Sequence, residues 1–191
     1  EILSQPEDFA YSKINTVARG KKDNYFWMGT GDMGAYKLKV TPENDLDFET
    51  VGHPHGLEYT DVQDIYEDEN KNLWISTFGE GAYKLIMDSV SDDYKKSVHF
   101  SQENGLGSMF VKTIYEDTGG NIWAATYGNG LSVLLNEAFV SYNFEEIGFS
   151  KSIYSMAIED SIYWLGGDGA ILRYNIHSPD KYQIIDKGLP N

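Results

Sequence analysis

The sequence predicts an all-β fold built from four similar four-stranded antiparallel units. Three observations carry this prediction: short apolar runs between turn residues, no sustained helical periodicity, and one phrase that occurs four times. The phrase is clearest over 62–85, VQDIYEDENKNLWISTFGEGAYKL, and returns over 111–133 as VKTIYEDTGGNIWAATYGNGLSV. Two less exact copies begin at Ile14 and Ile153. The tryptophans occupy the same point of each copy, 41 to 49 residues apart: Trp27, Trp74, Trp123 and Trp164.

Each copy holds three predicted strands and is followed by a fourth. The strands are runs of four to six residues rich in Ile, Val, Tyr, Phe and Trp, bounded by Gly, Asn and Asp. In the first copy they are expected over 13–18, 25–29, 35–40 and 46–51. The fourth strands of the later copies are expected over 97–100, 140–144 and 182–185.

The Trp-bearing strands are apolar at consecutive positions, as in Leu73-Trp74-Ile75, so both faces must be covered. Because no helices are predicted, the cover has to come from sheets on both sides. A four-stranded sheet between copies of itself is a blade of a β-propeller. We therefore expect one Trp per blade to fill the wedge between neighbouring blades.

A Gly-containing motif connects each copy to the next, as in His55-Gly56-Leu57 and Asn104-Gly105-Leu106. We call the connecting segments that contain this motif the handover segments. The motif places the blade repeats at approximately 9–55, 56–104, 105–147 and 148–187, with 188–191 as the start of a further blade. The chain begins at Glu1 without an initiating Met. We expect an excised part of a larger propeller; closure of the four blades on themselves is the alternative.

Charge and composition exclude several classes of function. The formal net charge is −15, which disfavours binding to nucleic acid or to anionic membrane surfaces. There is no cysteine, and no apolar run is long enough for a membrane helix. We expect no cofactor and no metal site, and no direct membrane insertion of this segment.

Three motifs match patterns known from catalytic or binding sites, but their sequence context does not support such a role. Residues 29–34 match GxGxxG, but a strand rather than a helix follows them. His53 and His55 alone make an incomplete metal site. The Glu-Asp pairs, such as Glu67-Asp68, recur from copy to copy, which indicates a turn former rather than a catalytic acid.

These phrases resemble the two-component regulator propeller repeat. The shared pattern is apolar-x-x-Ile-Tyr-Glu-Asp, Asn-apolar-Trp and Thr-aromatic-Gly-x-Gly, with Gly-Leu at the handover. The first copy departs from it at the Glu-Asp turn, and the fourth at the Thr. The resemblance implies a seven-bladed propeller in the periplasmic or extracytoplasmic sensor portion of a hybrid two-component histidine kinase. It also implies an oligosaccharide or other small ligand, dimerisation through the parent protein, and a kinase in a part absent here.

A ligand site is expected where the handover loops meet the turns between second and third strands, because loops on a rigid scaffold concentrate binding residues. Aromatic rings beside carboxylates and amides suit a sugar. The predicted ligand-binding residues are Thr30, Asp32, His55, Tyr59, Phe78, Glu80, Phe110, Tyr127, Asn129 and Asp168. No catalytic residues are expected. A propeller lyase or glycosidase, and a structural platform for protein interactions, are the alternatives.

Overall fold

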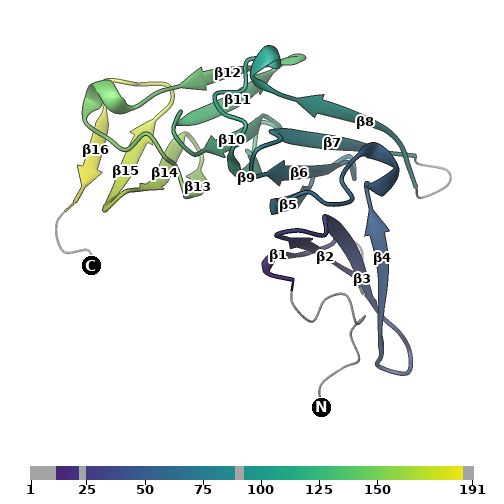
Figure 1. Cartoon of the computed structure of the whole chain (residues 1–191). Helices are drawn as coiled ribbons and strands as arrows, with labels where there is room; N and C mark the ends of the chain where they lie inside the picture. Colours follow the sequence, from purple (N-terminus) through teal and green to yellow (C-terminus); the bar gives the residue numbers. More distant parts are fainter. Residues whose placement is uncertain (1–11, 22–24, 89–92, 187–191) are drawn as a thin grey trace. The chain divides into compact units, whose positions relative to one another are not determined.

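The computed structural model describes residues 12–21, 25–88 and 93–186, which form four four-stranded antiparallel sheets (Figure 1). We call these sheets blades one to four. The chain divides into two compact units, 1–99 and 100–191. Blades one and two consist of β1 (Ile14–Arg19), β2 (Tyr25–Thr30), β3 (Ala35–Val40), β4 (Leu46–Val51), β5 (Val62–Glu67), β6 (Leu73–Thr77), β7 (Ala82–Met87) and β8 (Tyr94–Phe100). Blades three and four consist of β9 (Val111–Glu116), β10 (Ile122–Thr126), β11 (Leu131–Leu135), β12 (Ala138–Tyr142), β13 (Ser155–Glu159), β14 (Ile162–Gly167), β15 (Ala170–Asn175) and β16 (Tyr182–Ile185).

The predicted all-β propeller-blade architecture is confirmed, and most strand positions agree to within one residue. Consecutive strands pair in each blade, so every blade is a simple up-and-down meander. The fourth strands of blades two and three differ most, since β8 begins at Tyr94 and β12 at Ala138. The handover segments 52–61, 101–110 and 143–154 contain short 3-10 helices, η2 (His53–His55), η3 (Gln102–Asn104) and η4 (Glu145–Ile147). Within the described residues, no helix is long and apolar enough to cross a membrane.

Each unit has its own apolar core between its two blades. In the first unit, Trp27 of blade one packs with Ile65, Leu73 and Leu85 of blade two, all nearly inaccessible to solvent. In the second unit, Trp123 of blade three packs with Tyr163 and Leu172 of blade four. The Trp123 and Tyr163 rings meet edge-on, with centroids 4.6 Å apart. The wedge role predicted for Trp27 and Trp123 is therefore confirmed.

The recurring acid of the Glu-Asp pair holds the turn between the first two strands. Asp117 Oδ1 accepts hydrogen bonds from the backbone N–H groups of Gly119 and Asn121, both at 2.9 Å. Its Oδ2 accepts from the indole Nε1 of Trp123 at 2.9 Å. Asp68 makes the corresponding contacts with Asn72 and Trp74. The predicted turn-forming role is confirmed, and the acid also fixes the tryptophan ring.

Candidate ligand-binding surface

In both units the turns between second and third strands meet the handover segments, as the antiparallel topology predicts. In the first unit, the backbone N–H of Gly34 donates to the Thr60 carbonyl at 3.2 Å, and that of Phe78 to the Asp61 carbonyl at 2.9 Å. In the second unit, the N–H of Tyr127 donates to the Phe110 carbonyl at 2.9 Å. The two classes of loop therefore form one surface within each unit.

Thr30 lies beneath this surface and supports it, and is not exposed on it. Its side chain is fully buried, and its hydroxyl donates to the Gly34 carbonyl at 2.9 Å while accepting from the Met33 N–H at 2.9 Å. Thr77 and Thr126 make the same bond to the carbonyls of Gly81 and Gly130. The threonine of the repeat thus stabilises the turn between the second and third strands, which carries the exposed residues.

The second unit gathers two rings and a carboxylate. Asp168 accepts a hydrogen bond from the Tyr154 hydroxyl at 2.6 Å and another from Ser150 Oγ at 2.7 Å. The rings of Tyr154 and Tyr127 meet edge-on with centroids 5.3 Å apart. Three chain segments contribute: the handover segment, the β10–β11 turn and the β14–β15 turn. We call Tyr127, Ser150, Tyr154 and Asp168 the tyrosine–aspartate cluster.

Hydrogen bonding sets the charge state of this cluster. The hydrogen bonds from Tyr154 and Ser150 lower the pKa of Asp168. The bond to Asp168 in turn raises the pKa of Tyr154. At neutral pH the cluster therefore presents the Asp168 carboxylate beside the neutral phenol of Tyr154.

Two other predicted residues of the second unit flank the cluster's loops. Phe110 is 42% exposed, and its carbonyl accepts from the Tyr127 N–H. Asn129 is exposed, and its side-chain amide donates to the Gly107 carbonyl at 2.5 Å. Both residues thus lie on the handover segment or the turn that it contacts.

In the first unit, Glu80 is the centre of a second polar group. Its carboxylate accepts from the Tyr83 hydroxyl at 3.2 Å and from the Thr60 hydroxyl at 3.4 Å, and its backbone carbonyl lies 2.6 Å from His99 Nε2. The His99 and Tyr83 rings stack with centroids 4.5 Å apart. Burial first, and then the Glu80 charge and hydrogen bond, raise the pKa of Tyr83 to about 12.

The other predicted residues of the first unit are mostly exposed. Tyr59 is 78% exposed and Phe78 47% exposed, both large apolar surfaces for loops. Asp32 is exposed and accepts a hydrogen bond from Ser12 Oγ. These side chains are exposed on the loops of the first unit.

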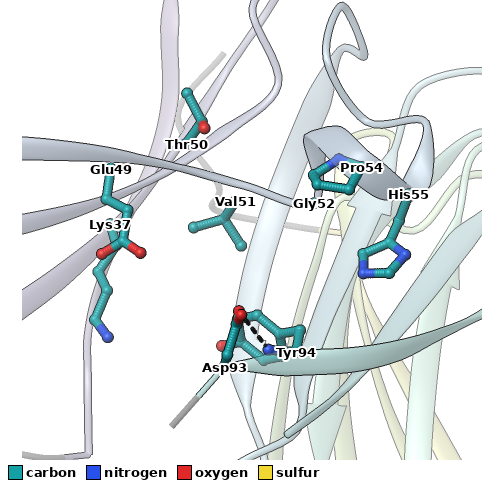
Figure 2. A pocket seen from close by; sticks show the side chains of 9 residues that line it. All are labelled: Lys37, Glu49, Thr50, Val51, Gly52, Pro54, His55, Asp93 and Tyr94. Atoms are coloured by element: carbon teal, nitrogen blue, oxygen red, sulfur yellow. Dashed lines mark hydrogen bonds between the residues drawn. The ribbon is translucent and has the colours of Figure 1, made fainter. Parts of the chain in front are cut away.

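His55 is placed differently from the other predicted residues. It lines a cavity of about 360 Å³ in the first unit, and Figure 2 shows Lys37 and Glu49 on one side of it and Pro54 and His55 on the other. Val51, Asp93 and Tyr94 complete much of the lining. No other predicted ligand-binding residue lines this cavity. His53, the partner in the discounted metal motif, has a side chain outside the described part.

Tyr154, which was not among the predicted residues, contacts both Tyr127 and Asp168 and so joins these two predicted residues. Tyr154 is the second residue of the copy that begins at Ile153, and β13 begins one residue after it, at Ser155. Its position just before the strand, opposite a turn carboxylate, was the available signal. Among the described residues, no group of three or more His, Asp or Glu side chains is placed to hold a metal ion.

Comparison with known families agrees with these repeats. The family model "Two component regulator propeller" matches residues 56–79 and 105–128. The second and third copies are two-component regulator propeller repeats. The matched segments run from the handover phrase, through the Glu-Asp turn and the Trp strand, into the glycine turn. No curated protein matches the chain.

Solved structures with similar folds include propellers of several kinds. The extracellular domain of the one component system named BT4673, from B. thetaiotaomicron, is 23% identical with a TM-score of 0.72 over 93% of this chain and 25% of that one. The extracellular domain of BT3049 from the same organism, named as a hybrid two component system, is 20% identical, with a TM-score of 0.62 over 95% of this chain and 30% of that one. The Neurospora crassa Pan2 WD40 domain is 11% identical, with a TM-score of 0.62 over 93% of this chain and 52% of that one.

At these identities the likeness shows the propeller fold. The chain spans 25% and 30% of the length of the two B. thetaiotaomicron proteins. The fold of this chain is therefore similar to that of a part of each of those extracellular domains.

Proposed function

We propose that the chain is a ligand-sensing propeller segment of a two-component system regulator, on the extracytoplasmic side of the membrane. The regulator propeller repeats support this proposal, as do the extracellular domains to which the fold is similar. The signal would pass to a kinase elsewhere in the parent protein, which would also supply any dimer contacts. The single observation that carries a binding role is the tyrosine–aspartate cluster.

The ligand class that fits this cluster best is an oligosaccharide. A sugar ring offers apolar C–H faces that pack on Tyr127 and Tyr154, and hydroxyls that donate to the Asp168 carboxylate. Asp168 already accepts two hydrogen bonds, which fix its position, and a carboxylate has room for more acceptor contacts. Phe110 and Asn129 extend the same surface. In the first unit, Asp32, Tyr59, Phe78 and Glu80 would offer a separate surface to a ligand, and His55 would offer the cavity that it lines.

We propose a sensor rather than an enzyme because the recurring aspartates have structural roles in the blades. Asp68 and Asp117 each hold a turn and a tryptophan indole, so their lone pairs are already engaged. The imidazole of His99 stacks on Tyr83 and contacts a backbone carbonyl rather than a carboxylate. General acid–base chemistry would need a base within reach of a partner.

Isothermal titration calorimetry against a panel of neutral oligosaccharides tests the proposal. For the glycan that binds, Asp168→Asn and Tyr154→Phe should each weaken the affinity about tenfold. Asp168→Asn removes the charge of the group that accepts from the sugar hydroxyls, and Tyr154→Phe removes the hydrogen bond that holds Asp168 in place. The matched controls are Asp180→Asn and Tyr182→Phe, which alter exposed residues away from the cluster. Binding that is unchanged in the cluster variants, or a panel in which no glycan binds, would contradict the proposed site or ligand class.

A further inference from the structure

Blade three lacks a cation that each of the other blades places on its tryptophan. In those blades the residue that pairs with the tryptophan from the third strand is a lysine or an arginine, whose charged group lies between 4.8 and 5.7 Å from the ring centroid. The pairs are Trp27 with Lys37, Trp74 with Lys84, and Trp164 with Arg173. In blade three the residue that pairs with Trp123 is Val133.

Blade two shows where this cation lies when the blade also carries the turn aspartate. The ammonium of Lys84 lies 3.8 Å from Asp68 Oδ2, and the Asp68 side chain is only 4% exposed. The same oxygen accepts the hydrogen bond of the Trp74 indole at 3.1 Å. At 3.8 Å the ammonium acts through its charge rather than through a hydrogen bond. Blade two therefore supplies a counter-charge for its buried acid from its own third strand.

Blade three keeps the acid but has no such counter-charge. Partial burial would raise the pKa of Asp117, but hydrogen bonds from Asn121, Trp123 and Gly119 outweigh it and lower the pKa, so the side chain is ionised at neutral pH. Asp117 forms no ion pair with any residue in the described part of the chain. The Tyr163 hydroxyl lies 3.3 Å from its Oδ2, but burial raises the pKa of this phenol, so Tyr163 supplies a neutral donor.

A cavity of about 320 Å³ lies beside Asp117 in the second unit. The β9–β10, β13–β14 and β15–β16 turns form it, at the opposite end of the strands from the tyrosine–aspartate cluster. Its described lining contains two aspartates and no lysine or arginine: Asp117, Thr118, Gly119, Asn121, Trp123, Asp160, Ser161, Tyr163, Ile176 and His177. The cavity therefore offers negative charge at the position where blade two has its lysine.

The second carboxylate and the apolar part of the lining come from blade four. Asp160 is exposed, and its carboxylate has no hydrogen bond or ion pair with a described residue. Ile176 is half-buried and can cover the methylene groups of an alkyl chain. The formal net charge of −15 raises the local concentration of cations near such a site.

We propose that this cavity binds a primary alkylammonium group, whose charge takes the place beside Asp117 that the Lys84 ammonium has beside Asp68. Asp160 supplies the second carboxylate, and the alkyl chain lies against Ile176. The group comes either from a lysine side chain of a protein partner or from a free linear amine. The site is separate from the proposed glycan surface, and the inference does not depend on that surface.

Other cations fit the cavity less well. A guanidinium recognises a carboxylate through two parallel hydrogen bonds, which need free lone pairs. The oxygens of Asp117 already accept from the backbone of Gly119, from the backbone and side chain of Asn121, and from the Trp123 indole. Calcium takes about six to eight oxygen ligands. The described lining offers only two carboxylates, and no described group of three or more His, Asp or Glu is placed to hold a metal ion.

An NMR titration of the 191-residue chain with n-butylammonium chloride, at constant ionic strength, tests the proposal. The backbone amide signals of Gly119 and Ser161, which line the cavity from blades three and four, should shift and saturate together. Methylguanidinium and Ca²⁺ should each bind about fivefold or more weakly, for the reasons given above. A saturable shift that is absent at both amides, or equal affinity for the three cations, overturns the proposal.

Substitutions of the two aspartates test the role of their charges. Asp160→Asn should weaken n-butylammonium binding about threefold, as expected for an exposed charge. The fold should be retained, since Asn also tolerates the positive φ of 53° at this position. Asp117→Asn should weaken binding about tenfold, because this charge is closer to the expected ammonium position. Glu159→Gln, which removes an exposed acid outside the cavity lining, should change the affinity by less than about twofold. An affinity that Asp160→Asn leaves unchanged overturns the proposal, even if Asp117→Asn does not fold.

Two further probes distinguish the sources of the group. Nα-acetyl-lysine N-methylamide represents a lysine within a protein, and 1,4-diaminobutane represents a free linear amine. Tighter binding of the lysine derivative supports a protein partner, whereas tighter binding of the diamine, with a charge at each end, supports a small-molecule ligand. If neither probe shifts the Gly119 and Ser161 amides, the cavity does not bind alkylammonium groups and the proposal is wrong.

Discussion

The Trp123 indole donates to Asp117 Oδ2 at 2.9 Å, so the acid of the turn and the tryptophan of the next strand form one unit. The same oxygen lies 3.3 Å from the Tyr163 hydroxyl of blade four. Asp117 therefore links its own turn, its own wedge residue and the neighbouring blade. This relationship explains why the acid and the Trp keep a constant spacing in the two well-matched repeats.

Replacing Asp117 with Ala should lower the free energy of unfolding by about 2–3 kcal/mol, because it leaves the buried indole and phenol donors without an acceptor. Glu137→Ala is the matched control, since Glu137 lies exposed in the β11–β12 turn. Urea denaturation of both variants measures the difference. An equal, small effect of the two substitutions would show that the Asp117 contacts contribute little to stability.

The same contacts predict a dependence of stability on pH. Partial burial alone would raise the pKa of Asp117, but hydrogen bonds from Asn121, Trp123 and Gly119 outweigh it and lower the pKa. The stabilisation is then complete above the unfolded-chain pKa of about 3.9 and is lost as the pH falls through the folded value. Between about pH 5 and pH 2, the wild type should lose stability more steeply than Asp117→Asn. Parallel curves in urea denaturation would contradict this assignment.

The sequence was sufficient for the strands, the repeat period and the turn-forming acids, because these depend on local pattern. It did not reveal that Glu67 reaches the Trp27 of the preceding blade, since that contact depends on how two sheets pack. Trp164 has the same place in its copy as the other tryptophans, yet it is only half-buried, which the local pattern does not indicate. The candidate surface was predicted as a set of loops, whereas the Tyr154–Asp168 bond required the actual strand boundary.

Two glycines of the β10–β11 turn should respond differently to substitution. Both have positive φ, 91° at Gly128 and 69° at Gly130. A Cβ at Gly128 would meet no atom within 4 Å, so Gly128→Ala carries only the left-handed backbone cost of about 1–2 kcal/mol. A Cβ at Gly130 would lie 2.1 Å from the Tyr142 carbonyl oxygen, so Gly130→Ala should destabilise considerably more. Thermal unfolding with equal melting temperatures for the two variants would contradict this clash.

Tyr83 should ionise late in an alkaline titration, at a pKa of about 12. Because this value is raised above the unfolded one of about 10, the linked stability is present below pH 10 and is lost as the pH rises towards 12. The difference in absorbance at the phenolate band between wild type and Tyr83→Phe isolates this residue from the other tyrosines. Glu80→Gln should lower the pKa of Tyr83, leaving burial as the remaining cause of the shift. An unchanged value in Glu80→Gln would show that Glu80 does not act on Tyr83.

The charge state of the tyrosine–aspartate cluster can be measured without a ligand. Tyr154→Phe removes the first of the two hydrogen bonds that lower the pKa of Asp168, and Ser150→Ala removes the second. Each variant should therefore raise the pKa of Asp168, with the larger rise for Tyr154→Phe, in an NMR titration of the carboxyl carbon. Tyr182→Phe, in β16, should leave that pKa unchanged. Since Tyr154 and Asp168 are exposed, Tyr154→Phe should change folding stability little, so a loss of glycan affinity in this variant would report on binding rather than on unfolding. An Asp168 pKa that Tyr154→Phe does not alter would mean that the two side chains are not bonded in solution, and the cluster would then not be preorganised for a ligand.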